Sequence, residues 1–194
     1  LAVVVAYGHL IKPILLSVPV HGFVNLHASL LPAYRGAAPV PWAILSGESV
    51  SGASVFQLDE KFDTGAIIGT AELPITPDDT AGSYLTKLAP HGAALMARMV
   101  TAIEDGNANR QPRDNSRASA APKFSKEDGR IDWNQPFAAI ERRVRAFQPW
   151  PLAFTTLTTA KGEVRVTVLA MERAEIGSAG GAPGAILQAD AKAG

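Results

Sequence analysis

Cysteine is absent from the 194-residue sequence, which excludes disulfide scaffolds, thiolate metal sites and cysteine nucleophiles. No apolar run approaches the ~20 residues that a membrane helix needs, so we expect no membrane association. The formal net charge is zero, with 18 basic and 18 acidic residues, which argues against general attraction to polyanions. A 47% share of hydrophobic residues is enough to build a core, in one large domain or two small ones.

Charge is spread unevenly along the chain. Residues 1–109 carry five basic and nine acidic side chains, whereas residues 110–145 carry nine basic and five acidic ones. A basic middle part is typical of proteins that contact phosphates there, but a solvated linker of mixed charge has the same composition. Charge alone therefore leaves both interpretations open.

The two ends of the sequence look unlike natural termini. The opening residues, LAVVVAYGHL, contain no Met and no basic stretch of a signal peptide. We therefore expect a piece of a longer, cytoplasmic protein whose N-terminus lies upstream. The last residues, 189–194, likewise do not resemble a natural end.

The first hundred residues predict alternating strands and helices, as in an α/β fold. The Val-rich run Leu1–Ala6 indicates a strand of a parallel sheet, buried on both faces. The sequence predicts further strands at Phe23–His27, Val50–Leu58 and Ala66–Leu73, and helices at Pro13–Val18, Pro39–Ser46 and Ala81–Glu104. Pro90 should kink or divide the last of these helices.

The composition becomes polar at Gly106, and this change indicates two domains. We predict a first domain at residues 1–106, a linker at 107–124 and a second domain at 125–194. In the second domain, a stripe of Phe137, Ile140, Val144 and Phe147 predicts a helix. Short β-rich runs follow at Leu152–Thr159, Val164–Met171 and Ala185–Gln188, which favours a small barrel or sandwich.

Asn25 and His27 lie two apart on a predicted strand, so their side chains should share one face. They stand at its carboxyl end, where open α/β sheets place ligands. Asn can donate to a developing oxyanion, and His can donate or move a proton near neutral pH. Asp63, in a later loop, could hold the imidazole and accept a proton. The structural alternatives are polar side chains bonded to nearby backbone, and an Asx turn at Asp63.

Other polar residues have open roles. Ser29 and Arg35 stand in a turn-rich loop, where they could contact a ligand or belong to a simple surface crossover. The remaining histidines, His9, His21 and His91, lack the spacing of metal ligands, so we expect no metal site.

Aromatic and basic side chains gather in the second domain. Trp133 and Trp150 flank a helix that carries Arg142, Arg143 and Arg145. Aromatics among bases can stack on nucleobases and contact phosphates. A buried Trp beside a solvated basic face would give the same pattern.

Four separated motifs, in the right order, resemble the methionyl-tRNA formyltransferases, a branch of the folate-dependent formyltransferase family. They are NLHASLLPAYRGAAP at Asn25–Pro39, DEKFDTGAII at 59–68, PKFSKEDGRIDW at Pro122–Trp133 and RVRAFQPWP at Arg143–Pro151. The last two motifs would not be expected in relatives that act on glycinamide ribonucleotide.

This resemblance implies a partial Rossmann-like formyltransferase sheet followed by a truncated, OB-like β-barrel that contacts tRNA. It implies formyl transfer from 10-formyltetrahydrofolate to the amine of methionyl initiator tRNA, without a metal, and it makes Asn25, His27 and Asp63 the catalytic residues. The folate-binding residues implied by the resemblance are Tyr7, Gly8, Leu10, Ile11, Ser29, Leu30, Leu31 and Pro32. The tRNA-binding residues that we expect are Arg142, Arg143 and Arg145.

In that family further strands precede the position of Leu1, so we expect residues 1–6 to form an exposed apolar sheet edge. We also expect a monomer, and weak or no activity from the 194-residue chain alone. Two other functions remain open. One is formyl transfer to a sugar nucleotide or another amine, and the other is RNA binding through residues 110–150 without catalysis.

Overall fold

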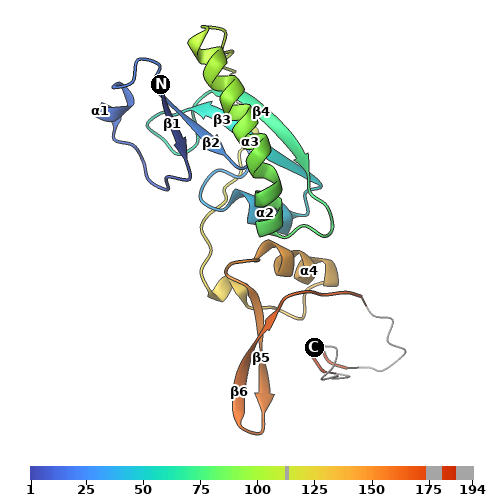
Figure 1. The fold of residues 1–194 in the computed structure, drawn as a ribbon. Coiled ribbons are helices and arrows are strands. Elements are labelled where there is room, and N and C mark those ends of the chain that lie inside the picture. Colours follow the sequence, from blue (N-terminus) through green and yellow to red (C-terminus); the bar gives the residue numbers. More distant parts are fainter. Residues whose placement is uncertain (112–113, 174–180, 187–194) are drawn as a thin grey trace.

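The computed structural model describes residues 1–111, 114–173 and 181–186, and Figure 1 shows two units joined by an extended connection. The strands are β1 (Ala2–Val5), β2 (Phe23–His27), β3 (Val50–Gln57), β4 (Ile67–Pro74), β5 (Ala153–Thr159) and β6 (Gly162–Val168). The α-helices are α1 (Pro13–Leu16), α2 (Pro39–Ser46), α3 (Ala81–Glu104) and α4 (Phe137–Ala146). The 3₁₀ turns are η1 (Asn115–Arg117) and η2 (Glu127–Gly129).

The first unit is built on a four-stranded sheet in the order β1-β2-β3-β4. Strands β1 and β2 pair in parallel, whereas the β2–β3 and β3–β4 pairs are antiparallel. The predicted α/β class is confirmed, and the sheet is mixed. The β3–β4 pair is antiparallel because residues 58–66 between them are too few for a parallel crossover, which needs a dozen or more.

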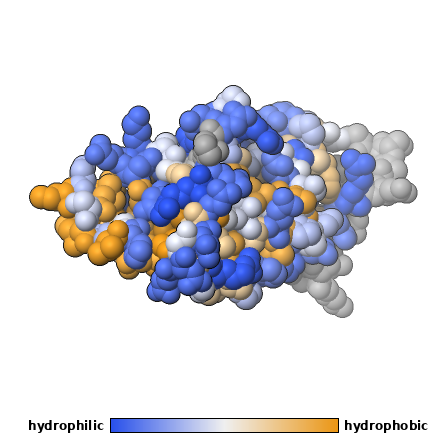
Figure 2. Space-filling view, turned by 90° about the horizontal axis from the view of Figure 1, so that it is seen from above, coloured by the Kyte–Doolittle hydropathy of each residue, from blue (hydrophilic) through white to orange (hydrophobic). Residues whose placement is uncertain are grey.

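Strand β1 forms an edge of this sheet. The prediction that it is buried on both faces is wrong, because Val3 and Val5 are 48% and 58% exposed. The exposed edge expected from the family resemblance is what forms. Figure 2 shows hydrophobic surface on the side where α1 lies, and the exposed residues of this part of the chain include Leu10, Ile14, Leu15, Val18 and Val20.

Helix α3 begins at a capping box and packs on β3 and β4. Thr80 Oγ1 accepts from the Ser83 N–H, while Ser83 Oγ accepts from the Thr80 N–H. Pro90 was predicted to kink or divide the helix, and the helix is not divided there, because it is continuous from Ala81 to Glu104. Pro90 itself is exposed, but Leu88 and Gly92 on either side are buried and hold both halves against the sheet.

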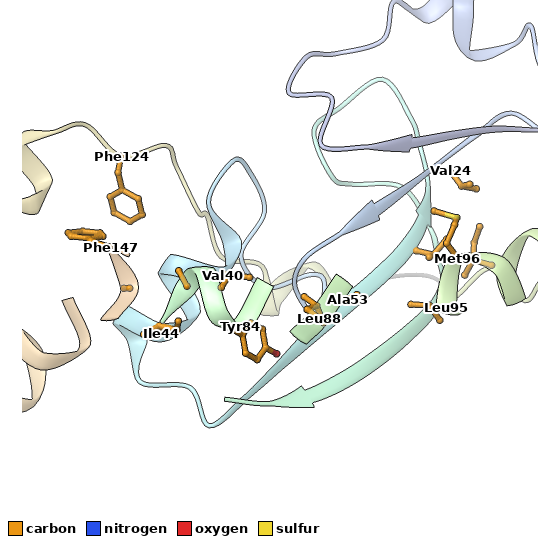
Figure 3. Close-up of a cluster of buried hydrophobic side chains, with 14 of the residues drawn as sticks. Val24, Val40, Ile44, Ala53, Tyr84, Leu88, Leu95, Met96, Phe124 and Phe147 are labelled. Atoms are coloured by element: carbon orange, nitrogen blue, oxygen red, sulfur yellow. The ribbon is translucent and has the colours of Figure 1, made fainter. Parts of the chain in front are cut away.

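One hydrophobic core extends from the sheet to the second unit (Figure 3). It contains Val24, Val40, Ile44, Ala53, Val55, Tyr84, Leu88, Leu95, Met96, Phe124 and Phe147. Phe124 belongs to the connection and Phe147 follows α4. At their junction Trp42 of α2 stacks on Phe124 with 4.9 Å between ring centroids, and Phe147 meets Phe124 edge-on at 4.8 Å.

The second unit consists of α4 and the antiparallel hairpin of β5 and β6. A smaller core of Ile131, Ile140, Val144 and Ala153 lies beneath it. The predicted strand at Ala185–Gln188 lies partly outside the described residues, and Ala185 and Ile186 are not in a strand. Of the helices described here, none is long and apolar enough to cross a membrane.

The connection, predicted as a linker at 107–124, runs back over the first unit. Gln111 exchanges two backbone hydrogen bonds with Ile67, at 2.9 and 3.3 Å. Trp42 Nε1 donates to the Pro122 carbonyl at 2.9 Å. Most of these bonds are made by backbone atoms, so they could not be predicted from the polar composition of the segment.

Asp79 is a buried carboxylate at the start of α3, close to α4. Only 1% exposed, it accepts from Thr76 N at 2.8 Å and Lys87 Nζ at 2.6 Å, while its backbone carbonyl accepts from Arg145 Nη1 at 2.9 Å. Burial raises the pKa of Asp79, but the hydrogen bonds from Lys87, Thr76 and Ser83 together outweigh burial and lower it from 3.8 to about 2.

We expect Asp79→Asn to lower the free energy of unfolding by about 2 kcal/mol at neutral pH, at about 1.4 kcal/mol per pKa unit. Because the folded-state pKa lies below the unfolded one, ionised Asp79 stabilises the fold above about pH 4. This contribution is lost as the pH falls towards about 2. Denaturant unfolding from pH 7 to 2 measures the difference, with Asp78→Asn as an exposed control. A difference that does not shrink with falling pH would contradict the prediction.

Candidate active site

Strand β2 places Asn25 and His27 on one face of the sheet. Their partners on β3 are Phe56 and Ser54, so these side chains share that face. Leu26 between them points to the opposite face, where a Cβ added to Gly92 of α3 would meet it at 3.0 Å. The two polar side chains therefore point away from the helix-covered core, as their spacing predicted.

Both ring nitrogens of His27 face protein oxygens. It is 7% exposed, its Nε2 lies 2.9 Å from the Tyr34 carbonyl oxygen, and its Nδ1 lies 3.9 Å from Asp63 Oδ2. Its ring also meets Phe56 edge-on, with 6.5 Å between centroids. Because a carbonyl oxygen only accepts, the proton of the neutral ring belongs on Nε2, and Nδ1 faces the carboxylate.

Asp63 reaches His27 from the loop between β3 and β4. Its own backbone is left-handed, with φ of +50°, and its Oδ2 accepts from the Gly36 N–H at 2.8 Å. The loop is shaped by Asp59, whose carboxylate accepts from Lys61 N at 3.0 Å and Thr64 Oγ1 at 2.7 Å. The imidazole and the carboxylate that the sequence could not place together are therefore neighbours.

A cleft of about 1250 Å³ opens at the carboxyl ends of β1 and β2. Its walls include the three predicted catalytic residues, Asn25, His27 and Asp63, and the predicted folate-binding residues Tyr7, Gly8, Leu10 and Ile11. Three further wall residues come from the connection and the second unit, namely Lys123, Phe124 and Trp150. Trp150 is 46% exposed, so an aromatic face remains available to a ligand.

These groups suit a reaction in which an oxyanion develops and a proton moves. The Asn25 amide can donate a hydrogen bond, His27 can donate or carry a proton, and the Asp63 carboxylate can accept one. Among the described residues, no group of three or more His, Asp or Glu could hold a metal ion.

Two family models match most of the chain. One, described as formyl transferase, covers residues 1–100, and the other, described as formyl transferase, C-terminal domain, covers residues 123–194. The chain belongs to the formyl transferase family.

Individual relatives agree with this assignment, and solved structures share the fold. A protein of Salinispora tropica named methionyl-tRNA formyltransferase is 50% identical over 153 residues, covering 79% of this chain and 50% of the relative. The chain thus spans about half the length of the curated relatives it matches. A Mycobacterium tuberculosis structure, described as a likely sugar N-formyltransferase, has a TM-score of 0.70 at 24% identity, covering 89% of this chain and 74% of that one. An N-formyltransferase of Helicobacter canadensis, in complex with folinic acid and dTDP-3-aminofucose, has a TM-score of 0.60 at 26% identity, covering 64% and 46%.

In this formyltransferase chain, the predicted folate-binding segment Ser29–Pro32 braces the loop behind the cleft. Ser29 is fully buried and its Oγ donates to the Ala33 carbonyl at 2.7 Å. Ser54 Oγ accepts from Leu31 N at 3.0 Å and donates to the Ser29 carbonyl at 2.7 Å. The segment supports the site from below, and its contact with folate remains a prediction.

The three arginines predicted to bind tRNA lie at the junction of the two units. Arg145 pairs with Glu141 and donates to Asp79, while Arg143 donates to the Asp128 carbonyl. Arg142 lies against the end of α2, where a Cβ added to Gly47 would meet its Nη1 at 2.8 Å. Each guanidinium thus helps to hold α4 in place, and tRNA binding by them remains a prediction.

The residues that orient the formyltransferase site through their backbone, Tyr34 and Gly36, were not predicted. The Tyr34 carbonyl accepts from His27, and the Gly36 N–H donates to Asp63. Both have positive φ angles, +59° and +118°. Gly36 in the turn-rich loop was the one available signal, since glycine favours such angles.

We expect the neutral His27 ring to carry its proton on Nε2. Long-range ¹H–¹⁵N NMR in alkaline solution distinguishes the two tautomers. His91 serves as an internal comparison, because its Nδ1 lies 3.0 Å from the Lys87 carbonyl and should carry the proton instead. A His27 ring protonated on Nδ1 and bare at Nε2 would contradict the orientation described here.

Proposed function

We propose that the protein carrying this chain transfers the formyl group of 10-formyltetrahydrofolate to the amine of methionyl initiator tRNA. The observation that carries the proposal is the approach of His27 Nδ1 to Asp63 Oδ2, at 3.9 Å, in a cleft that Asn25 also lines. Curated relatives at 49–50% identity are named methionyl-tRNA formyltransferase, and folinic acid in the Helicobacter canadensis structure supports a folate as formyl donor.

The reaction needs a neutral amine, a stabilised oxyanion and a group to receive a proton. The amine nitrogen attacks the formyl carbon, and the carbonyl electrons move to oxygen. The Asn25 amide donates a hydrogen bond to that oxygen, and the protonated His27 ring donates another from Nδ1, because Nε2 is bonded to the Tyr34 carbonyl. Asp63 takes the proton released by the amine. Collapse then breaks the bond from carbon to N10, and Asp63 passes the proton it took from the amine to N10, directly or through water, to give tetrahydrofolate.

The walls of the cleft support a substrate that touches both units. Lys123 and Trp150 line the cleft together with Asn25 and His27. A lysine suits a phosphate, and an exposed indole ring suits stacking on a base. The basic excess in residues 110–145 further favours a nucleic-acid partner. Monomeric state and cytoplasmic location remain predictions from the sequence.

Formyl transfer to a sugar nucleotide is the second candidate, because solved structures with this fold include proteins described as sugar N-formyltransferases. Their identity is 24–26%, against 49–50% for the curated tRNA enzymes. RNA binding without catalysis is a third reading, but it leaves the His27–Asp63 pair without a role.

Substrate competition separates these functions. With 10-formyltetrahydrofolate as donor, we expect kcat/KM for methionyl-tRNA to exceed that for a dTDP-amino sugar by at least about 100-fold, since a site built for one substrate leaves polar groups unpaired with another. A higher kcat/KM for the sugar nucleotide would contradict the proposal and support the second candidate. Tight tRNA binding without any formylation would instead favour the RNA-binding reading.

Loss of either predicted oxyanion donor should slow the chemical step. We expect Asn25→Ala to lower kcat by about 10²- to 10³-fold, the usual cost of removing one such donor, and His27→Ala to abolish transfer. Filter binding should show nearly unchanged tRNA affinity for both variants, with the exposed His21→Ala as control. Wild-type turnover by His27→Ala would end the catalytic assignment.

A further inference from the structure

The segment Ser119–Ala121 of the connection, here named the strap, lies against the loop that carries Tyr34 and Gly36. The strap and Arg35 form a parallel bridge. The Arg35 N–H donates to the Ser119 carbonyl at 2.8 Å, the Ala121 N–H donates to the Arg35 carbonyl at 2.6 Å, and the Ala38 N–H donates to the Ala121 carbonyl at 3.1 Å. The loop is therefore bonded on one side to the strap.

The same peptide units are bonded on their other side to the catalytic residues. In the unit that joins Tyr34 to Arg35, the N–H donates to Ser119 while the carbonyl accepts from His27 Nε2 at 2.9 Å. In the next unit, the Arg35 carbonyl accepts from Ala121 while the Gly36 N–H donates to Asp63 Oδ2 at 2.8 Å. Each unit thus links the strap to one member of the His–Asp pair.

Peptide planarity makes this linkage rigid. Because the six atoms of a peptide unit lie in one plane, fixing its N–H end also fixes the direction of its carbonyl. Hydrogen bonds at both ends of one unit also polarise each other and strengthen both. A shift of the strap would therefore turn the groups that hold His27 and Asp63.

Side-chain contacts add to the backbone bonds. Ser119 Oγ accepts from the Tyr34 N–H at 2.9 Å, which fixes the peptide unit before the two described above. Ala121 is fully buried, and a Cβ added to Gly36 would lie only 2.8 Å from its carbonyl oxygen. The strap and the loop are thus in close contact at Gly36, where no side chain would fit between them.

We propose that the strap is a positioning element of the active site, and that Ser119 is a positioning residue that acts on His27 and Asp63 through the loop from Tyr34 to Gly36. The kinetic part of this inference rests on the proposed formyl transfer, whereas its structural part does not.

Two substitutions test the strap in the protein that carries this chain. Ser119→Ala removes the bond to Tyr34, and we expect kcat to fall about five-fold with KM unchanged, the effect of one ordinary hydrogen bond. Ser119→Thr keeps the hydroxyl and should restore kcat. Ala121→Pro removes the donor to Arg35, and we expect a loss in kcat of about 100-fold or more from misplaced catalytic groups.

Matched controls lie in the same segment. Ser116→Ala removes a hydroxyl whose one bond among the described residues is within its own turn, to Asp114. Ala118→Pro removes a backbone bond to Asn115 and suits the φ of −71° at that position. Both controls should keep wild-type kcat and wild-type thermal stability.

NMR of the His27 ring separates this inference from the proposed function. In Ser119→Ala and Ala121→Pro, we expect the Nε2 proton to exchange faster with solvent, with a shifted ¹⁵N resonance, while His91 is unchanged. Absence of formylation by the wild type would refute the proposed function, and the NMR result would still decide the role of the strap. Unchanged His27 signals and unchanged kcat in Ser119→Ala would overturn the inference, even if Ala121→Pro fails to fold.

Discussion

Two consecutive peptide planes, between Tyr34 and Arg35 and between Arg35 and Gly36, are the constraint on which the candidate active site depends. One plane presents a carbonyl to His27 and the other presents an N–H to Asp63. The two planes take these orientations because Tyr34 and Gly36 have positive φ angles. Such an angle costs free energy at Tyr34, which has a Cβ. The Tyr34 hydroxyl, which donates to Glu48 at 2.6 Å, and the strap offset that cost by anchoring the loop on both sides.

The elements with a clear hydrophobic periodicity could be predicted from the sequence. Strand β2 and helix α3 lie where alternation and the apolar stripe indicated, and the shared face of Asn25 and His27 followed from a period of two. The distance from His27 to Asp63 could not be predicted, because it depends on the antiparallel return of β3 and β4. Nor could the path of the connection, since backbone hydrogen bonds leave no trace in composition.

At the junction between the units, the basic side chains of α4 have a structural role. Arg145 bonds to the Asp79 carbonyl and the Glu141 carboxylate. Arg143 bonds to the Asp128 carbonyl, and Arg142 lies against the end of α2. Phe124 and Phe147 join the core of the first unit. Long basic side chains pack through their stems as well as through their charge. A basic stretch can therefore indicate an internal interface as readily as a nucleic-acid surface.

The way the connection folds back bears on how the two units can be recombined. Trp42 Nε1 donates to the Pro122 carbonyl, and the residues just before Pro122 bond to the loop of the first unit. The segment predicted as a linker, residues 107–124, is therefore bonded to the first unit, which holds the candidate active site. In a chimera of two relatives, the crossover should therefore fall beyond Pro122. The strap and the loop to which it bonds then come from the same parent.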